Sequence, residues 1–402
     1  MAVTDDTVLA RDYPFSPPHR LDVDELYARL RAEQPVIRVQ LPYGERAWLA
    51  TRYADVRTVL GDPRFSRAAS VGRDVPRTNP YQPELGILAM DEPEHGRLRR
   101  LATKAFTARR IEALRPRTEQ IAAELLDAMA ATGQPADLVE HFATPLPIRV
   151  ICDLLGVPAS DQDKFHVWSE AVVSTTSLTP ERISEYIGNL HAYIGALLAD
   201  RRREPASDLL TAMAQARDAD PDGPSEDELV AFSAGLLAAG HETTVTQIPN
   251  FLYALLTNPG AMERLRGDPA LIPSAVEELL RWVPLGAAST FARYALEDVE
   301  LSGVTVRAGE PVVGSLTSAN RDERVFADPD TLDLARHPNP HIGFGHGVHH
   351  CAGAQLARME LQVALGALIR RFPGLRLGAG EDELVWKSGM LVRGLKSMPV
   401  AW

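Results

Sequence analysis

The feature that most constrains this fold is one long helical stretch, which the sequence predicts from Glu226 to about Leu256. Its start, Ser225-Glu226-Asp227-Glu228, has the pattern of a capping box. At a rise of roughly 1.5 Å per residue, the helix would be about 45 Å long. Its middle, residues 234–240, contains only small and apolar residues, so it has to be buried on most sides.

Helical periodicity dominates most of the remaining chain. One face of a helix is visible in residues 361–372, which end at Pro373-Gly374. Two β-rich patches interrupt this pattern: a hairpin of Val36–Gln40 and Ala47–Thr51, and the stretch 299–316. No change in composition marks a linker. We therefore expect a mainly α fold with small β-sheets, in a single domain over residues 1–402.

The composition narrows the possible classes of function. Hydrophobic residues make up 45% of the 402 residues and charged residues 24%, as in ordinary soluble proteins. A net charge of −12 argues against general nucleic-acid binding. Neither a signal peptide nor an apolar run of the ~20 residues that span a bilayer is visible. We expect a cytoplasmic protein that does not bind membranes, with Cys152 as a packed core thiol and no disulfide.

The second cysteine lies in the sequence Phe344-Gly345-His346-Gly347-Val348-His349-His350-Cys351-Ala352-Gly353, directly before a helical stretch. Glycines let the backbone approach another group closely, and a helix N-terminus favours a thiolate. Taken alone, Cys351 could be a small buried hydrophobe. The neighbouring histidines also allow a zinc cluster or a cysteine nucleophile, although no second ligand pair or oxyanion motif accompanies them.

The spacing F-G-x-G-x-H-x-C-x-G resembles the haem-binding loop of the cytochrome P450 family, the haem-thiolate monooxygenases. The resemblance implies the cytochrome P450 fold, with haem b between the long central helix and the helix after the cysteine. Its iron would be bound by the thiolate of Cys351, and dioxygen would be a co-substrate. It also implies that four further residues contact the haem: Phe344, Gly345, Gly353 and Ala239.

Ala239-Gly240-His241-Glu242-Thr243-Thr244 places an acid and a hydroxyl in the middle of the long helix. Taken alone, the Thr243 hydroxyl would bond a carbonyl one turn back, which is the usual role of a threonine inside a helix. The stretch resembles the acid–alcohol motif of the family, on the helix that crosses the oxygen side of the haem. That resemblance implies that Thr243 hydrogen-bonds dioxygen and that Glu242 relays protons from solvent.

Several basic residues match the family's partners for the two haem propionates. His95 and Arg99 are four residues apart, on one face of a predicted helix, which by itself would be a solvated surface. The resemblance implies that both bind propionates, together with Arg293 and His341. Taken alone, the E-x-x-R pair Glu278 and Arg281 is an ordinary ion pair on one helix. The resemblance implies that it is the family's buried structural pair, with Arg336 as a third member.

By the same resemblance the substrate contacts come from 71–88, 167–186, 236–239, 285–291 and 390–392, with these residues as candidates: Leu88, Leu236, Ala288, Met390 and Leu391. These regions are mostly apolar. The chain is similar to soluble bacterial members that tailor actinomycete secondary metabolites, and 283–288 looks like macrolide-pathway members in antibiotic biosynthesis. We expect hydroxylation or epoxidation of an apolar polyketide or macrolide.

Two alternatives remain open. The first is oxidative C–C or C–N coupling, or cyclisation, of a peptide-derived substrate on the same haem. The second is a non-catalytic haem sensor, which would not need Glu242 and Thr243.

The chain shows no flavin or iron–sulfur module, so we expect electrons from NAD(P)H to arrive through a ferredoxin reductase and a ferredoxin. Four basic residues near the expected haem face would dock the acidic ferredoxin: Arg97, Arg100, Lys104 and Arg358. No repeat or coiled-coil pattern indicates an assembly, and we expect a monomer.

Overall fold

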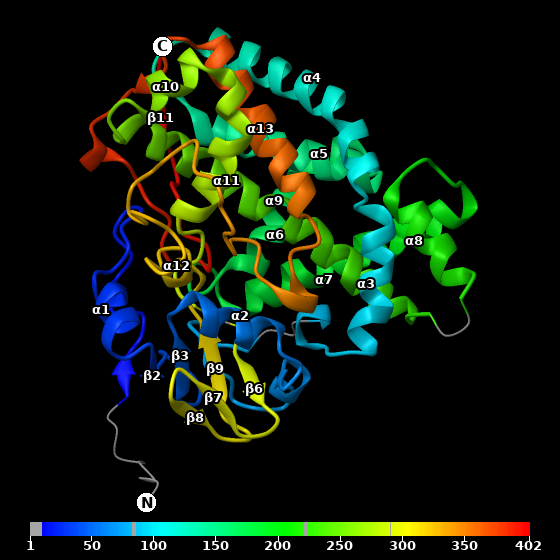
Figure 1. Cartoon of the computed structure of the whole chain (residues 1–402). Coiled ribbons are helices and arrows are strands. Elements are labelled where there is room, and N and C mark those ends of the chain that lie inside the picture. The colour runs from blue at the N-terminus through cyan, green and yellow to red at the C-terminus, as the bar shows by residue number, and fades with distance from the viewer. Residues whose placement is uncertain (1–9, 83–85, 221–222, 290) are drawn as a thin grey trace, which may run out of the picture. The chain divides into compact units, whose positions relative to one another are not determined.

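The computed structural model describes residues 10–82, 86–220, 223–289 and 291–402 and is mainly helical with small sheets, as predicted (Figure 1). Its contacts group into two compact units. Unit 1 consists of Met1–Asp91, Gly286–Thr331 and Asn339–Cys351, and unit 2 consists of Glu92–Leu285, Leu332–Pro338 and Ala352–Trp402. A single domain over 1–402 stays a prediction.

Unit 1 is built on a six-stranded sheet in the order β1-β2-β3-β9-β6-β4. Figure 1 labels β2, β3, β9 and β6 of this sheet. The predicted hairpin is confirmed: β2 and β3 are antiparallel, with Val36 opposite Ala50. Strand β3 then pairs in parallel with β9, a strand from the second predicted β patch. The strands are β1 Arg11–Asp12, β2 Val36–Gln40, β3 Ala47–Ala50, β4 Phe65–Ser66, β6 Arg293–Ala295 and β9 Pro311–Gly314.

The other elements of unit 1 pack on this sheet or extend it. A core of Val56, Val59, Phe65 and Phe326 joins helix α2 to the strands. The hairpin of β7 and β8 accounts for the rest of the second β patch. These elements are α1 Leu26–Glu33, α2 Tyr53–Gly61, β7 Val299–Leu301, β8 Val304–Val306 and α12 Leu316–Ala319, with short 3-10 helices at Ala68–Ser70, Gly86–Ala89 and Gly347–His349.

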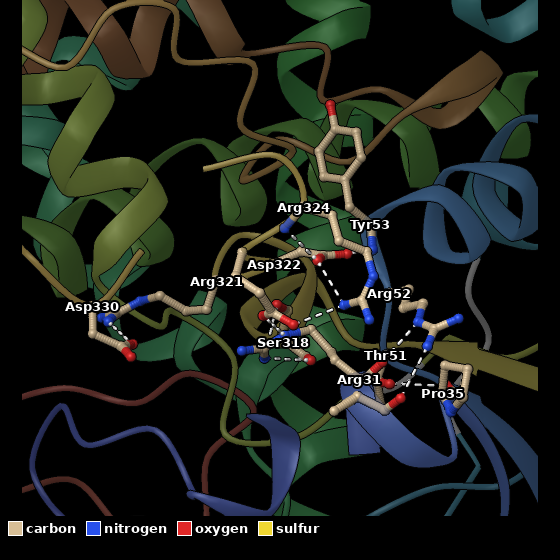
Figure 2. A network of polar contacts seen from close by, with 12 residues as sticks. Arg31, Pro35, Thr51, Arg52, Tyr53, Ser318, Arg321, Asp322, Arg324 and Asp330 are labelled. Atoms are coloured by element: carbon tan, nitrogen blue, oxygen red, sulfur yellow. Dashed lines mark hydrogen bonds and ion pairs between the residues drawn. The ribbon is translucent and has the colours of Figure 1, made fainter. Parts of the chain in front are cut away.

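A polar network ties α12 and the residues after it to the N-terminal helices of unit 1 (Figure 2). Arg31 in α1 donates through Nη1 to the carbonyl and the hydroxyl of Ser318 in α12. Asp322, after α12, accepts a 2.8 Å hydrogen bond from the Tyr53 backbone N–H at the start of α2, where a carboxylate is favoured. These bonds hold α12 and the segment that follows it.

Unit 2 is a helical assembly around α9 with a small three-stranded sheet. The sheet has the order β10-β11-β5. The helices are α3 Glu94–Ala105, α4 Ala108–Thr132, α5 Pro145–Leu155, α6 Gln162–Val173, α7 Pro180–Arg203, α8 Leu209–Asp218, α9 Glu226–Thr257, α10 Ala261–Gly267, α11 Ile272–Trp282 and α13 Ala354–Arg371, and the strands are β5 Ala136–Asp137, β10 Arg376–Leu377 and β11 Pro399–Ala401.

Helix α9 confirms the prediction made from its sequence. It begins with the Ser225–Glu228 capping box and continues for 32 residues, with Pro249 inside it. Most of its central and C-terminal residues are buried. A Cβ at Gly240 would lie 2.9 Å from Ile151 Cδ1, so a larger residue there would require the Ile151 side chain in α5 to shift.

None of the helices in the described ranges combines the length and apolar character that crossing a bilayer requires.

Candidate active site

The loop around Cys351 is held in shape by glycines and by its own backbone. Gly345 and Gly347 have φ angles of +75° and +73°, which favour glycine. A Cβ at Gly347 would lie 2.4 Å from the Leu60 carbonyl oxygen, so no other residue fits. The Cys351 N–H donates to the Phe344 carbonyl at 2.9 Å, and the Cys351 side chain is exposed. Helix α13 begins three residues later, with Gly353 at its N-cap, as the sequence predicted.

Two side chains of unit 1 anchor the approach to this loop. Asn320 Oδ1 accepts a 2.9 Å hydrogen bond from the Ile342 N–H, and the Tyr53 hydroxyl donates to the Pro340 carbonyl at 2.6 Å. Between them, His341 Nδ1 accepts from the Gly343 N–H at 3.1 Å. The ring hydrogen of His341 therefore sits on Nε2, the nitrogen that could donate to an anion.

Arg293, in β6, has a buried guanidinium that is not fully hydrogen-bonded. Its Nε has no hydrogen-bond partner in the described residues. Burial lowers the pKa of Arg293 to about 10, because the charged form is poorly solvated there. A buried guanidinium in this state requires an anion, which is the chemistry of a haem propionate.

The sequence reading missed Arg67, a second buried guanidinium. Its Nε donates to the Leu88 carbonyl at 2.6 Å and its Nη1 to the Ala292 carbonyl at 2.5 Å, while Nη2 has no hydrogen-bond partner among the residues that the structure describes. Burial and the nearby Arg293 cation lower its pKa to about 10. No local pattern predicts the burial of Arg67, because an arginine beside Phe65-Ser66 resembles an ordinary exposed arginine.

In unit 2, His95 and Arg99 lie one turn apart on α3, as predicted. His95 is buried, and its Nδ1 faces Glu92 Oε1 at 3.3 Å. Arg99 is half-buried. Their spacing confirms the shared helical face, and their binding of propionates stays a prediction.

In the middle of α9, which is largely buried, one stripe of side chains is accessible to solvent. Ala239 is exposed, and Leu236 and Thr243 are half-buried, at spacings of three and four residues. Thr243 Oγ1 donates to the Ala239 carbonyl at 3.1 Å, the bond expected of any threonine inside a helix. This stripe therefore brings together Thr243, the expected haem contact Ala239 and the substrate candidate Leu236.

Glu242 does not lie on that stripe. It is 1% exposed, and its Oε1 lies 3.2 Å from Nε2 of His241 and 3.5 Å from the hydroxyl of Ser169 in α6. The sequence reading missed His241 and Ser169. A usable indication was present: His241 lies midway between Leu237 and Val245 at a spacing of four, on an apolar face where a histidine needs a partner.

The predicted structural cluster is confirmed in α11 and 332–338. Glu278 accepts hydrogen bonds from Arg281 Nε and Nη2 at 2.8 and 2.7 Å. Arg336 Nε lies 3.1 Å from both carboxylate oxygens, and the Asp333 N–H donates at 2.9 Å. Glu278 and Arg281 are buried and Arg336 is half-buried, which makes the cluster a structural support.

Three of the segments assigned to the substrate meet in unit 2. Val173, Met390 and Val392 pack together with Leu285 against them. Backbone bonds join the segments: Leu391 N–H to the Val173 carbonyl at 2.8 Å, and Arg393 N–H to the Leu285 carbonyl at 2.7 Å.

The substrate candidates of unit 1 have different surroundings. Leu88 is 44% exposed, whereas Ala288 packs against the core around Val39 and Leu49. Residues 83–85 and 290 of the predicted substrate segments, and the Lys104 side chain, lie outside the described residues.

Cys152 is buried in α5 as predicted, and burial raises the pKa of its thiol to about 12. No group of three or more His, Cys, Asp or Glu side chains in the described part of the chain is placed to hold a metal ion.

Comparison with known proteins identifies the class to which this fold and site belong. The protein-family model for cytochrome P450 matches residues 175–269 and 270–392. Mycinamicin IV hydroxylase/epoxidase from Micromonospora griseorubida is 57% identical over 392 residues, 98% of each chain. Nocardicin C N-oxygenase from Nocardia uniformis subsp. tsuyamanensis is 52% identical over 394 residues, again 98% of each.

Solved structures agree with these sequences. The mixed-function P450 MycG has a TM-score of 0.93 at 56% identity, with coverage of 98% of this chain and 100% of that chain. The LnmA cytochrome P450 hydroxylase of Streptomyces atroolivaceus has a TM-score of 0.92 at 52% identity, with the same coverage. The chain belongs to the cytochrome P450 family. It is a haem-thiolate monooxygenase, an oxidoreductase with the cytochrome P450 fold.

Proposed function

We propose that this monooxygenase hydroxylates or epoxidises an apolar natural product of the polyketide or macrolide class. The observation that carries the proposal is the 57% identity to mycinamicin IV hydroxylase/epoxidase, over 98% of both chains. The apolar packing of Val173, Met390 and Val392 is consistent with a carbon skeleton as substrate.

We further propose that haem b is bound through the thiolate of Cys351. The residues present fit that group: an exposed thiol ends a glycine-shaped loop, and Arg293 offers a buried guanidinium nitrogen without a partner. His95, Arg99, Arg293 and His341 would bind the propionates, and Phe344, Gly345, Ala239 and Gly353 would contact the ring. When bound, the haem supplies the iron at which dioxygen is reduced and split.

The residues of α9 would supply protons to that chemistry. Thr243 presents its hydroxyl on the uncovered stripe and Glu242 holds a carboxylate one residue away, on the buried side of the helix. A relay of this kind needs a group that alternately accepts and donates a proton, which both side chains can do. Thr243→Ala should still bind haem but divert reducing equivalents into hydrogen peroxide.

A ferredoxin and its NAD(P)H-dependent reductase are the proposed electron source. Among the expected docking residues, Arg100 is exposed. Arg97 and Arg358 are each already paired, with Glu228 at 2.6 Å and with Glu277 at 2.7 Å. Their charges are thereby largely compensated, so Arg100 is the stronger docking candidate.

Optical titration of the purified ferric protein tests the substrate and the ligand. Mycinamicin IV should shift the Soret band towards the high-spin form, and turnover should give a product with one added oxygen atom. Nocardicin C serves as the comparison. If Cys351→Ser had the same pigment, the same optical absorption bands and full turnover, the assignment of the Cys351 thiolate as the haem ligand would be refuted. No spectral shift and no product with mycinamicin IV would contradict the proposed substrate class.

A further inference from the structure

A buried polar cluster in unit 2 joins α9 to α6 beside the proposed proton relay. The side chains of Ser169, His241 and Glu242 are all at most 1% exposed. His241 Nε2 lies 2.7 Å from Ser169 Oγ and 3.2 Å from Glu242 Oε1, and its Nδ1 lies 2.9 Å from the Leu237 carbonyl oxygen. Every polar atom of the imidazole therefore faces a partner.

The partners determine where the hydrogens lie. A carbonyl oxygen only accepts, so Nδ1 must donate to Leu237. The Ser169 oxygen lies 2.6 Å from the Phe165 carbonyl oxygen and 2.7 Å from Nε2, so the hydroxyl links the imidazole to the α6 backbone. Nε2 also faces Glu242 Oε1 at 3.2 Å.

We propose that His241 is the positioning residue for Glu242, and that Ser169 ties this pair to α6. The inference rests on the proposed function, in which Glu242 relays protons. In this arrangement Nε2 carries a hydrogen that it shares with Glu242 Oε1, and the resulting ion pair fixes the direction of the carboxylate. Ser169 lies one turn before Val173, which packs with Met390 in the region assigned to the substrate. The relay is thus held by the helix that contacts the substrate.

Three variants and one matched control test this arrangement. His241→Phe and Ser169→Ala remove the partners of the carboxylate, and Glu242→Gln removes its charge. Ser233→Ala is the control: Ser233 is also fully buried and donates to a carbonyl one turn back, Leu229 at 2.7 Å, without contacting the cluster. Product formed per NAD(P)H is measured with a ferredoxin and its reductase, together with peroxide release and the solvent isotope effect.

We expect coupling to fall about tenfold in His241→Phe and about threefold in Ser169→Ala, less than the loss of an acid–base group itself. The solvent isotope effect should rise in both variants, because proton delivery becomes slower. Ser233→Ala should match the unmodified enzyme. Equal coupling in Ser169→Ala and Ser233→Ala, together with full coupling in His241→Phe, would overturn the proposal.

A spectroscopic measurement separates positioning from general loss of structure. In the diamagnetic ferrous carbonyl holoenzyme, ¹⁵N NMR of labelled histidine reports both ring nitrogens, and the His241 signal is assigned by its absence in His241→Phe. We expect two N–H nitrogens, one of them lost in Glu242→Gln. An unprotonated Nε2 in the unmodified enzyme would refute the ion pair.

The Glu242→Gln variant distinguishes failure of the positioning role of His241 from failure of the proton-relay role of Glu242. Full coupling in Glu242→Gln would remove the relay and the positioning role together. Uncoupling in Glu242→Gln with full coupling in His241→Phe would leave the relay in place and refute the positioning role alone.

Discussion

Replacing Arg281 tests the buried cluster of α11 in the most quantitative way. Glu278 is 0% exposed, and Arg281 provides two of its shortest contacts, at 2.7 and 2.8 Å. In Arg281→Met the carboxylate loses both of these contacts and keeps those with Arg336 and the Asp333 backbone N–H. Removing one partner of a buried ion pair costs about 3–5 kcal/mol, because the remaining charge is left undercompensated. We expect a loss of this size in the free energy of unfolding.

Scanning calorimetry at a fixed scan rate measures this loss. With an unfolding entropy of about 2.1 cal/mol/K per residue over 402 residues, the Tm should fall by about 4–6 °C. The amount of haem bound per protein should fall as well. The cluster holds the 332–338 segment, which directly precedes residues 339–351 with the proposed haem ligand Cys351.

Arg115→Met is the matched control. Arg115 pairs with Glu112 at the same E-x-x-R spacing, but Glu112 is 62% exposed. An exposed pair contributes about 1 kcal/mol or less, so the Tm should change by about 1 °C. If Arg281→Met lowered the Tm no more than Arg115→Met, the assumption that burial sets the cost would be wrong.

Four further results are expected. In the haem-free protein at pH 8, iodoacetamide should label the exposed Cys351 but not the buried Cys152. The pKa of about 12 leaves about one Cys152 thiol in ten thousand ionised, and only the thiolate reacts. Labelling of Cys152 and not of Cys351, detected by mass spectrometry of the peptides, would contradict this. Arg293→Leu should release haem to apomyoglobin faster, since a buried cation for the propionates is lost, and an unchanged release rate would contradict this. Arg100→Glu should slow reduction by ferredoxin at low salt and converge with the unmodified enzyme at high salt; equal rates at low salt would exclude this docking site. Glu360 is fully buried, neither carboxylate oxygen has a hydrogen-bond partner in the described residues, and burial raises its pKa well above the usual value. The unfolded chain ionises first, so stability relative to Glu360→Gln should decrease as pH rises above about 4.5, and parallel denaturation curves of the two proteins would refute this.

Local patterns in the sequence were enough to predict much of the fold. The Ser225–Glu228 capping box and the hairpin of β2 and β3 both concern residues that are close in the chain. Such patterns carry their own geometry, because a helix repeats every 3.6 residues and a strand every two. The haem and relay residues came instead from the family resemblance.

Contacts between distant segments could not be predicted in this way. Ser169 and His241 are 72 positions apart, and Asn320 and Ile342 are 22 apart. Their meeting depends on how helices and loops pack, which no local periodicity encodes. Arg67 shows the same limit, because its burial is set by the Leu88 and Ala292 carbonyls that it bonds.

The backbone bonds that join Val173, Leu285 and the 391–393 segment have a consequence for how this enzyme can diversify. The Leu391–Val173 and Arg393–Leu285 bonds use only main-chain atoms, so they survive replacement of the apolar side chains around them. New side chains can be installed at Met390 or Val392 while the surrounding framework keeps its course. Directed evolution of substrate preference should therefore begin at these two positions, where variation is tolerated without rebuilding the scaffold.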